Sequence, residues 1–479
     1  MKTFKKEYIH YLIALIIGIV IAVALPASNG LTNYGVRVIA IMVPCLYLWL
    51  TTNTHWTSLM CLALLVCTQA VEGGPNAIWA GSMGHFVVIT VMVYMLLNVC
   101  LTETGVINKI AMWFVSRKFI EGRPYAFMTM FFASNVIIGF FVDNLSLAII
   151  YIGIAEVLLK NMGCEKGSPF YTTIMLGTLW GNCLLSICSP IAHALPNIIM
   201  GIAEAQVGVH ITYAQWLAFG AIYAAIIFVV MMIIMRIWNP DTSAFVNYDV
   251  EKVRAETPAL SKNGKIASAI FIIVVAFVVV PQIFKTGAVL GYLNSLGVVI
   301  PAIFGVVALA LIRSDGKPIL DVPAAFRKVP WPPVIFAGTV SVLAVPLSSE
   351  ATGISTWLGN VLRPVIGNMG PTMIVVVLVL LAILMTNFLS NTVTQVLFFS
   401  IGAILLANSN YSLAAFAVVI AIASGMATIT PSASIVSPFY FAEKHLTMKP
   451  ILAPNLIFVA ACFVICAFIG VPLATAIIG

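Results

Sequence analysis

A group of hydroxyl and amide side chains lies inside an apolar segment of the chain. Residues 386–395 read Thr-Asn-Phe-Leu-Ser-Asn-Thr-Val-Thr-Gln, within an apolar run from about Met373 to Leu406. Hydrocarbon cannot satisfy such groups, so they must face protein, water or a ligand. Hydroxyls and freed carbonyls coordinate hard cations, and helix N-termini attract anions. The segment therefore favours a binding site for ions over the structural alternative, a helix-capping turn that neighbouring segments bury.

A second polar break contains a carboxylate. Asp143-Asn144 interrupts the apolar run 125–160, and Asp143 is the only aspartate that the topology given below places deep in a membrane segment. Two functional interpretations stay open, a cation ligand and a protonatable coupling group. The structural alternative is a carboxylate that caps a half-helix beginning at Leu145. His193 is equally open, between a proton relay or anion contact and a hydrogen-bonded packing role.

Composition fixes the class of protein that must position these residues. Of 479 residues, 62% are hydrophobic and 8% are charged, and the mean hydropathy is +1.10. No soluble domain of this length could cover itself with water-compatible surface, so we expect an all-α polytopic membrane protein. The net charge of +7 then reflects topology, and no nucleic-acid partner is expected. The nine cysteines lack disulfide or zinc spacing, and no nucleotide-binding loop or His-Glu metal motif occurs, so we expect neither an enzyme nor ATP-driven transport.

The apolar segments predict about eleven transmembrane helices plus two re-entrant hairpins. Residues 125–160 and 371–407 are too long for one span, and each has a polar break at its middle. If the N-terminus lies inside and both hairpins return to their own side, all but Arg37, Lys285 and Arg363 of the 23 Lys and Arg residues face the cytoplasm. This topology puts the C-terminus outside. The expected location of the protein is the plasma (cytoplasmic) membrane or cell inner membrane. The expected spans are residues 8–26, 33–52, 56–72, 85–101, 170–200, 213–238, 266–284, 288–312, 332–348, 411–443 and 452–477.

Four blocks recur in the same order at nearly constant spacing. Thr104-Gly105 matches Thr352-Gly353 at an offset of 248, and Asp143-Asn144 matches Ser390-Asn391 at 247. Gly177 also matches Gly425, and a Ser-Ile-x-Ser-Pro sequence occurs at 186–190 and 434–438. Such order indicates duplication, and five spans per copy give the copies opposite orientation in the membrane. The expected organisation is an uncleaved N-terminal helix over 1–30, a first inverted repeat over 31–238, a cytoplasmic linker over 239–265 and a second inverted repeat over 266–479.

The two Ser-Ile-x-Ser-Pro sequences predict broken helices. Proline removes a backbone donor and frees a carbonyl, and the serines add hydroxyls. Each copy therefore has a polar hairpin tip followed, some forty residues on, by a break inside a span. Four interrupted elements converging on one site are the arrangement of secondary transporters.

At these residues the chain resembles the divalent anion/sodium symporter family of the ion-transporter superfamily. Ser390-Asn391-Thr392, with Thr386 four residues before it, is similar to that family's signature at a hairpin tip. Val329-Pro330-Trp331 and Glu350-Ala351-Thr352-Gly353 support the resemblance. It implies a homodimer that carries out sodium-coupled symport of a small organic anion, usually a dicarboxylate. It also implies a fixed scaffold and a moving transport bundle, an elevator-type alternating access.

The resemblance also implies roles for individual residues. Cations would bind at Asp143, Asn144, Ser186 and Ser189 in the first copy and at Thr386, Ser390, Asn391, Ser434 and Ser437 in the second. Substrate contacts would come from Asn144, Ser146, Asn391, Thr392 and Thr394.

The first signature departs from the family pattern. It reads Asp143-Asn144-Leu145, and Leu145 removes a hydroxyl expected to hold one substrate carboxylate. A monocarboxylate or a bulkier organic anion therefore remains an alternative substrate to a C4-dicarboxylate. Protons are an alternative coupling ion, in a proton-coupled anion transporter or a cation/proton antiporter that uses Asp143.

Overall fold

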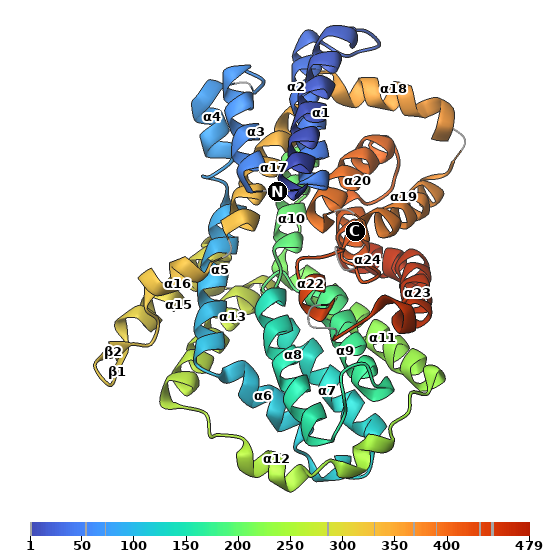
Figure 1. Cartoon of the computed structure of the whole chain (residues 1–479). Helices are drawn as coiled ribbons and strands as arrows, with labels where there is room; N and C mark the ends of the chain where they lie inside the picture. Colours follow the sequence, from blue (N-terminus) through green and yellow to red (C-terminus); the bar gives the residue numbers. More distant parts are fainter. Residues whose placement is uncertain are drawn as a thin grey trace.

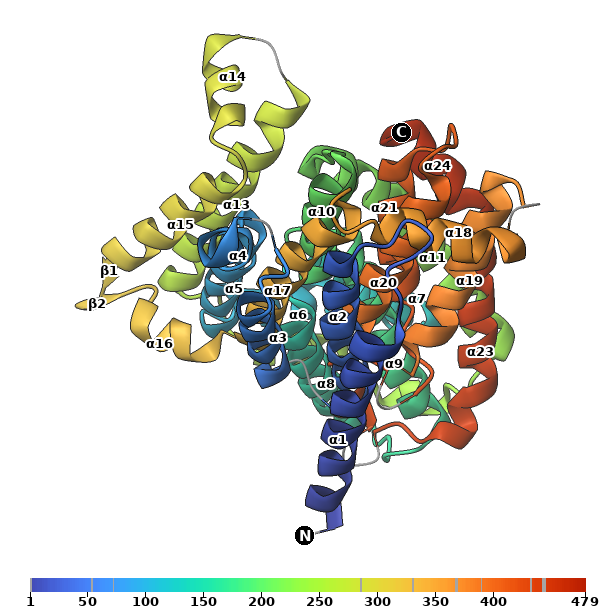
Figure 2. The same ribbon diagram turned by 90° about the horizontal axis from the view of Figure 1, so that it is seen from above.

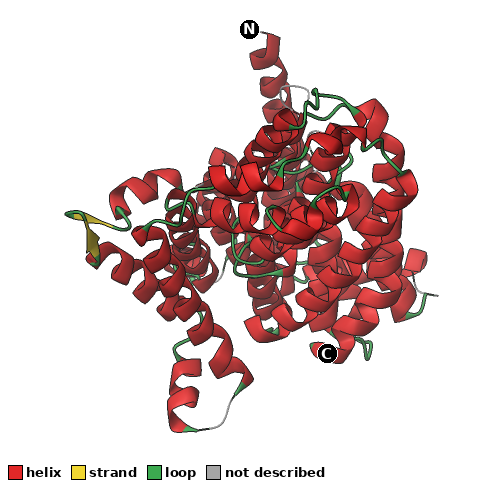
Figure 3. Ribbon diagram, turned by 90° about the horizontal axis from the view of Figure 1, so that it is seen from below, coloured by secondary structure: helices red, strands yellow, loops and turns green. Residues whose placement is uncertain are grey.

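The chain folds into helices arranged in two groups that lie side by side (Figures 1 and 2). The computed structural model describes residues 1–479 except 1, 53–54, 72, 285–286, 330, 367–368, 389, 431–432 and 442–444. Among the described residues the only strands are β1 (Arg313–Ser314) and β2 (Lys317–Pro318), a short antiparallel pair (Figure 3). The expected all-α fold of a polytopic membrane protein is confirmed.

The first group, here called the scaffold group, contains the N-terminal helices and the helices that follow the linker. Its α14 projects away from the other helices in Figure 2. Its members are α1 (Lys2–Ala24), α2 (Asn33–Thr51), α3 (His55–Cys67), α4 (Gly74–Gly81), α5 (Phe86–Glu103), α13 (Lys262–Ile283), α14 (Ala288–Ser295), α15 (Val299–Leu311), α16 (Val322–Lys328) and α17 (Trp331–Ser348).

The second group, here called the hairpin group, contains both polar breaks. Its helix α10 packs against α5 and α17 of the scaffold group and against α20 and α21 of its own group. Its members are α7 (Pro124–Gly139), α8 (Asn144–Asn161), α9 (Pro169–Trp180), α10 (Ala194–Val207), α11 (Tyr213–Trp238), α19 (Pro371–Thr386), α20 (Asn391–Leu406), α21 (Leu413–Ser424), α22 (Ser437–Phe441), α23 (Met448–Ile465) and α24 (Val471–Ile477).

Fewer helices than expected are long enough to cross a membrane unbroken. Among the described residues six helices meet that requirement, or seven if α14 and α15, which meet at 84°, count as one span. The expected spans 170–200 and 411–443 are each divided, because their helices α9 and α21 end at Trp180 and Ser424. The number eleven thus remains a prediction, and the interruptions within the spans are the observed feature.

Two short helices connect the groups, α6 (Val106–Val115) and α18 (Ile354–Ile366). Each follows a Thr-Gly pair, and each leads into a helical hairpin, α7–α8 or α19–α20. Gly105 and Gly353 have φ angles of +74° and +64°, in the left-handed region that glycine adopts without strain. We call Thr104-Gly105 the first junction and Thr352-Gly353 the second junction.

The second junction is held by the start of α2. The backbone N–H of Thr32 donates to the carbonyl of Thr352 at 3.1 Å, and the Thr32 hydroxyl accepts from the N–H of Gly35 at 3.2 Å. A Cβ on Gly35 would lie 2.1 Å from the Thr352 oxygen, and one on Gly353 would lie 1.8 Å from the Gly30 oxygen. Both glycines are required because the two backbones touch.

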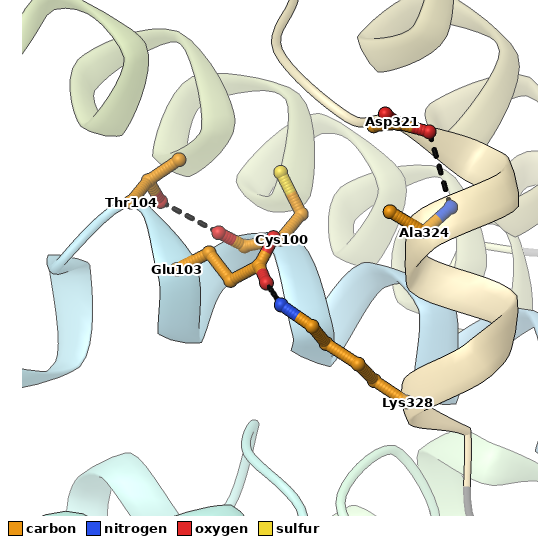
Figure 4. A network of polar contacts seen from close by, with 6 residues as sticks. All are labelled: Cys100, Glu103, Thr104, Asp321, Ala324 and Lys328. Carbon is orange, nitrogen blue, oxygen red and sulfur yellow. Dashed lines mark hydrogen bonds and ion pairs between the residues drawn. The ribbon is translucent and has the colours of Figure 1, made fainter.

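The first junction is packed closely against the start of α13. The Ser261 hydroxyl accepts from the N–H of Gly264 at 3.0 Å, and a Cβ on Gly264 would lie 2.9 Å from the Thr104 oxygen. Beside this contact, Glu103 at the end of α5 pairs with Lys328 of α16 (Figure 4). Each junction is therefore held by the helix that opens the other expected repeat.

The linker that was expected in the cytoplasm contains α12 (Val250–Glu256) and passes beneath α6 and α7 in Figure 1. The Tyr248 hydroxyl donates to the carbonyl of Val115 at 2.8 Å, and the Arg254 guanidinium donates to the carbonyl of Ser116 at 2.8 Å. These bonds satisfy carbonyls at the end of α6, where the helix itself supplies no donors.

Candidate functional site

The tip of the first hairpin is capped by its own carboxylate. Asp143 precedes α8, and its Oδ1 accepts from the backbone N–H groups of Leu145 and Ser146 at 3.1 and 2.9 Å. The capping role that the sequence left open is thus present, although the helix begins at Asn144. Because capping occupies one carboxylate oxygen, it is compatible with a second role for the same side chain.

The first broken span meets this tip. After α9 the chain forms a π-helical turn over Gly181–Leu185 and a 3-10 turn over Ser186–Cys188, and α10 begins only at Ala194. The Ser189 hydroxyl donates to the carbonyl of Phe140 at 2.5 Å, and the Asn182 amide donates to the carbonyl of Asn144 at 2.9 Å. Hairpin tip and break therefore form one unit.

A small cavity of about 20 Å³ adjoins this unit. Asp143 and His193 line it from the hairpin group, and Tyr94 and Asn98 line it from α5 of the scaffold group. The Nδ1 atom of His193 accepts from the N–H of Leu195 at 3.1 Å, so the ring caps α10. The hydrogen-bonded structural role of His193 is therefore observed, and the ring also faces the cavity that contains Asp143.

At the tip of the second hairpin, oxygens from three helices converge. The Thr386 hydroxyl, at the end of α19, lies 3.0 Å from Oδ1 of Asn391, at the start of α20, and also contacts the carbonyl of Ser424, at the end of α21. The hydroxyls of Thr394 and Ser424 are buried and have no hydrogen-bond partner among the residues that the structure describes. Ser390 precedes α20 but makes no side-chain capping bond, in contrast to Asp143.

Two asparagines to which the sequence reasoning gave no role organise the second break. The Asn387 Oδ1 atom accepts from the N–H groups of Thr428 and Ile429 at 3.1 and 2.8 Å, and its amide donates to Met426 at 2.9 Å. Asn455 of α23 donates to the Thr428 carbonyl at 2.6 Å. Asn387 lies in the polar segment noted from the sequence. Asn455 stands alone in an apolar helix, and its position as a single amide among apolar residues is the one signal that the sequence offers.

The two breaks touch each other. A Cβ on Gly425 would lie 2.3 Å from a methyl of Ile187, so the second break passes directly over the first. The Ser434 hydroxyl lies 2.8 Å from that of Ser437 and 3.4 Å from the Cys183 sulfur. The four interrupted elements therefore meet in the centre of the hairpin group.

The predicted cation ligands are distributed differently from the expected sets. Asp143, Asn144 and Ser189 lie together, and the Ser186 side chain falls outside the described part. Thr386 and Asn391 lie together with the Ser424 carbonyl. Ser434 and Ser437 instead contact the first break, and no described contact joins them to the second tip. Of the predicted substrate ligands, Asn144, Ser146, Asn391 and Thr392 are half-buried at the tips and Thr394 is buried.

A large cavity lies away from these residues. It is a crevice of about 850 Å³ between α2, α17 and α18 on one side and α20 on the other, with mostly aliphatic walls. None of the predicted ligands lines it. We place the candidate site at the converging polar groups, because ion coordination depends on oxygen ligands and not on volume.

Comparison with known proteins agrees with the arrangement of interrupted helices. Residues 38–425, which include both hairpins and the first break, match the CitMHS family, described as citrate transporters. A protein of Cupriavidus necator named only "Membrane protein" is 23% identical over 374 residues, which cover 74% of this chain and 70% of that protein. The resemblance to divalent anion/sodium symporters is thereby refined to a related family. The chain is a multi-pass membrane protein that belongs to the CitMHS citrate transporter family.

Proposed function

We propose that this protein is a secondary active transporter of citrate or a closely related carboxylate, driven by a cation gradient. The observation that carries the proposal is the meeting of two hairpin tips and two unwound segments inside the hairpin group. Unwound backbone and helix ends at membrane depth persist only where they are held by protein or line a binding site. Family membership supplies the substrate class.

The second tip is the better anion site of the two. An 18-residue helix, α8, already has its N-terminal N–H groups occupied by Asp143. The 16-residue α20 has no side-chain cap, and it carries Asn391 and Thr392 in its first turn. Uncapped N–H groups and the positive end of the helix dipole attract a carboxylate. We infer that one substrate carboxylate binds there, with Asn144 and Ser146 facing the remainder.

Leu145 favours a bulky substrate. It stands where the related family has a hydroxyl that would hold a dicarboxylate. A tricarboxylate with a hydroxyl group is larger and carries its own additional polar groups. Because the departure weighs against a C4-dicarboxylate, citrate, the substrate named for the matching family, is proposed over succinate.

Sodium is the proposed coupling ion at the second tip. Thr386, Asn391 and the Ser424 carbonyl provide uncharged oxygens, which suit a monovalent hard cation because no carboxylate is present to favour a divalent one. A second cation site would use Asp143, Asn144 and Ser189. A specific observation favours the alternative of proton coupling, since Asp143 and His193 line one cavity.

Transport would proceed by movement of the hairpin group against the scaffold group, in a homodimer of the plasma or cell inner membrane. The connection of the groups through the short helices α6 and α18 supports this division. The proposed topology has the N-terminus inside and the C-terminus outside.

Uptake of radiolabelled citrate into proteoliposomes tests the proposal. A sodium gradient, a proton gradient and no gradient are compared, with succinate and sulfate as competing anions. We expect citrate accumulation that requires the sodium gradient and weaker competition by succinate. Accumulation driven only by a proton gradient would replace sodium by protons. The absence of citrate uptake under every gradient would refute the proposed function.

A further inference from the structure

Asn98 is a buried side chain on the scaffold group with an unused acceptor. It lies on α5 with 2% of its surface exposed, and within the described part of the chain its Oδ1 atom has no hydrogen-bond partner. Leaving such an acceptor unpaired costs about 1–3 kcal/mol. Asn98 lines the 20 Å³ cavity, as does Asp143. The volume is enough for one water-sized species.

Most other polar groups of the cavity are already used. The Asn197 amide donates to the carbonyls of Pro190 and His193 at 2.6 and 3.0 Å, and its oxygen accepts from Tyr213. The Tyr94 hydroxyl donates to the carbonyl of Val298 at 3.4 Å. These two side chains hold the first break and α15 in place, so neither is a free ligand.

The groups that remain have unequal character. Because Nδ1 of His193 accepts a backbone bond, a neutral ring carries its proton on Nε2 and is a donor toward the cavity. The Asp143 carboxylate and Asn98 Oδ1 are acceptors. The single Nε2–H of His193 can satisfy only one of these acceptors, so a positively charged or second proton-donating species in the cavity would pair with the other.

We propose that Asn98 and Asp143 form a monovalent-cation site shared between the scaffold group and the hairpin group. One negative charge and one amide oxygen are matched to a single positive charge. The site is complete only in the arrangement seen here, because its two ligands lie on different groups. A bound cation therefore stabilises this arrangement and must leave, or remain with Asp143 and the other ligands of the hairpin group, when the groups move apart.

This inference uses the proposed transport function only in the expectation that the groups move. Its first test is a binding measurement. The purified protein is heated in detergent at increasing NaCl, with choline chloride keeping ionic strength constant. We compare the wild-type protein with Asn98→Leu, which keeps the volume and removes the acceptor, and with Asn98→Asp, which adds a charge. Thr90→Val is the matched control, because Thr90 is buried on the same helix and, among the described residues, its hydroxyl bonds only to the Phe86 carbonyl.

We expect the sodium concentration for half-maximal stabilisation to rise about tenfold or more in Asn98→Leu, as for the loss of one ligand to a charge. It should fall in Asn98→Asp and stay unchanged in Thr90→Val. Unchanged sodium dependence in both Asn98 variants would overturn the shared site, as would stabilisation of the wild-type protein by choline as strong as by sodium. If Asn98→Leu fails to fold, the direction of the shift in Asn98→Asp decides.

The binding result is independent of the transported anion. Failure of citrate uptake together with the expected sodium shifts would refute the proposed function and leave the shared site intact. Sodium-driven citrate uptake together with unchanged sodium dependence of the Asn98 variants would do the opposite.

Discussion

Two buried threonines of the second hairpin differ in whether the hydroxyl is hydrogen-bonded, so substituting each of them gives a paired test of the role of that hydroxyl. Thr386 is fully buried and its hydroxyl bonds to Asn391 and Ser424. Thr394 is 1% exposed and its hydroxyl has no partner. Valine has nearly the shape of threonine, so both substitutions remove one hydroxyl and leave packing unchanged.

The structure predicts opposite effects on stability. In Thr386→Val the loss of the single hydroxyl proton, which Asn391 Oδ1 and the Ser424 carbonyl share, leaves buried oxygens unpaired and destabilises the protein by about 1–3 kcal/mol. In Thr394→Val the removal of an unpaired buried hydroxyl is neutral or stabilises by about 1 kcal/mol. Apparent melting temperatures of the two variants are measured side by side in detergent without sodium. Thr386→Val should melt below the wild-type protein, and Thr394→Val should melt at or above the wild-type value.

Uptake kinetics of the same two variants distinguish a sodium ligand from a substrate ligand. If Thr386 coordinates sodium, the half-saturating sodium concentration for citrate uptake rises about tenfold or more in Thr386→Val. If Thr394 contacts substrate, Thr394→Val raises the KM for citrate and leaves its sodium dependence unchanged. Equal stability of the two variants together with wild-type sodium dependence in Thr386→Val would refute the proposal that Thr386, Asn391 and the Ser424 carbonyl bind sodium.

Three further substitutions test other parts of the molecule. Asp143→Asn keeps a residue type that caps helices well, so it should fold but lose part of the cation dependence of uptake, and full wild-type dependence on both sodium and pH would contradict a coupling role. Asn455→Leu leaves the Thr428 backbone unpaired and should lower the free energy of unfolding by about 2–4 kcal/mol, seen as a lower melting temperature. Gly35→Ala places a Cβ 2.1 Å from a carbonyl oxygen and should abolish the monodisperse peak in size-exclusion chromatography, whereas Gly153→Ala, with nothing within 4 Å, should not.

The interruptions of the helices were predictable because they follow from solvation. A run such as Ser390-Asn391-Thr392 cannot lie in hydrocarbon, and helix α20 begins within it at Asn391. The start of α8 at Asn144 follows from the preference of aspartate for capping positions. These conclusions need only the local sequence.

The partners across the breaks were not predictable in the same way. Periodicity and composition do not reveal that Asn387 pairs with backbone some forty residues later, because that contact depends on how α19 and α21 pack. For the same reason Ser434 and Ser437 were expected beside the second tip, whereas the structure places them against the first break. The cavity that Asn98 and Asp143 line lies between two groups of helices, so the sequence of no single segment predicts it.

The two junctions have a consequence for how such a chain could arise. The first helix of one half, at Gly35, holds the junction of the other half, and Gly264 does the same in return. If the two halves are inverted repeats, as the sequence predicts, a polypeptide of half this length would complete its junction only by associating with a second copy inserted in the opposite orientation. Gene fusion would then have preserved an antiparallel subunit contact that already existed. Two separately expressed halves of the present protein should accordingly be stable only when they are made together.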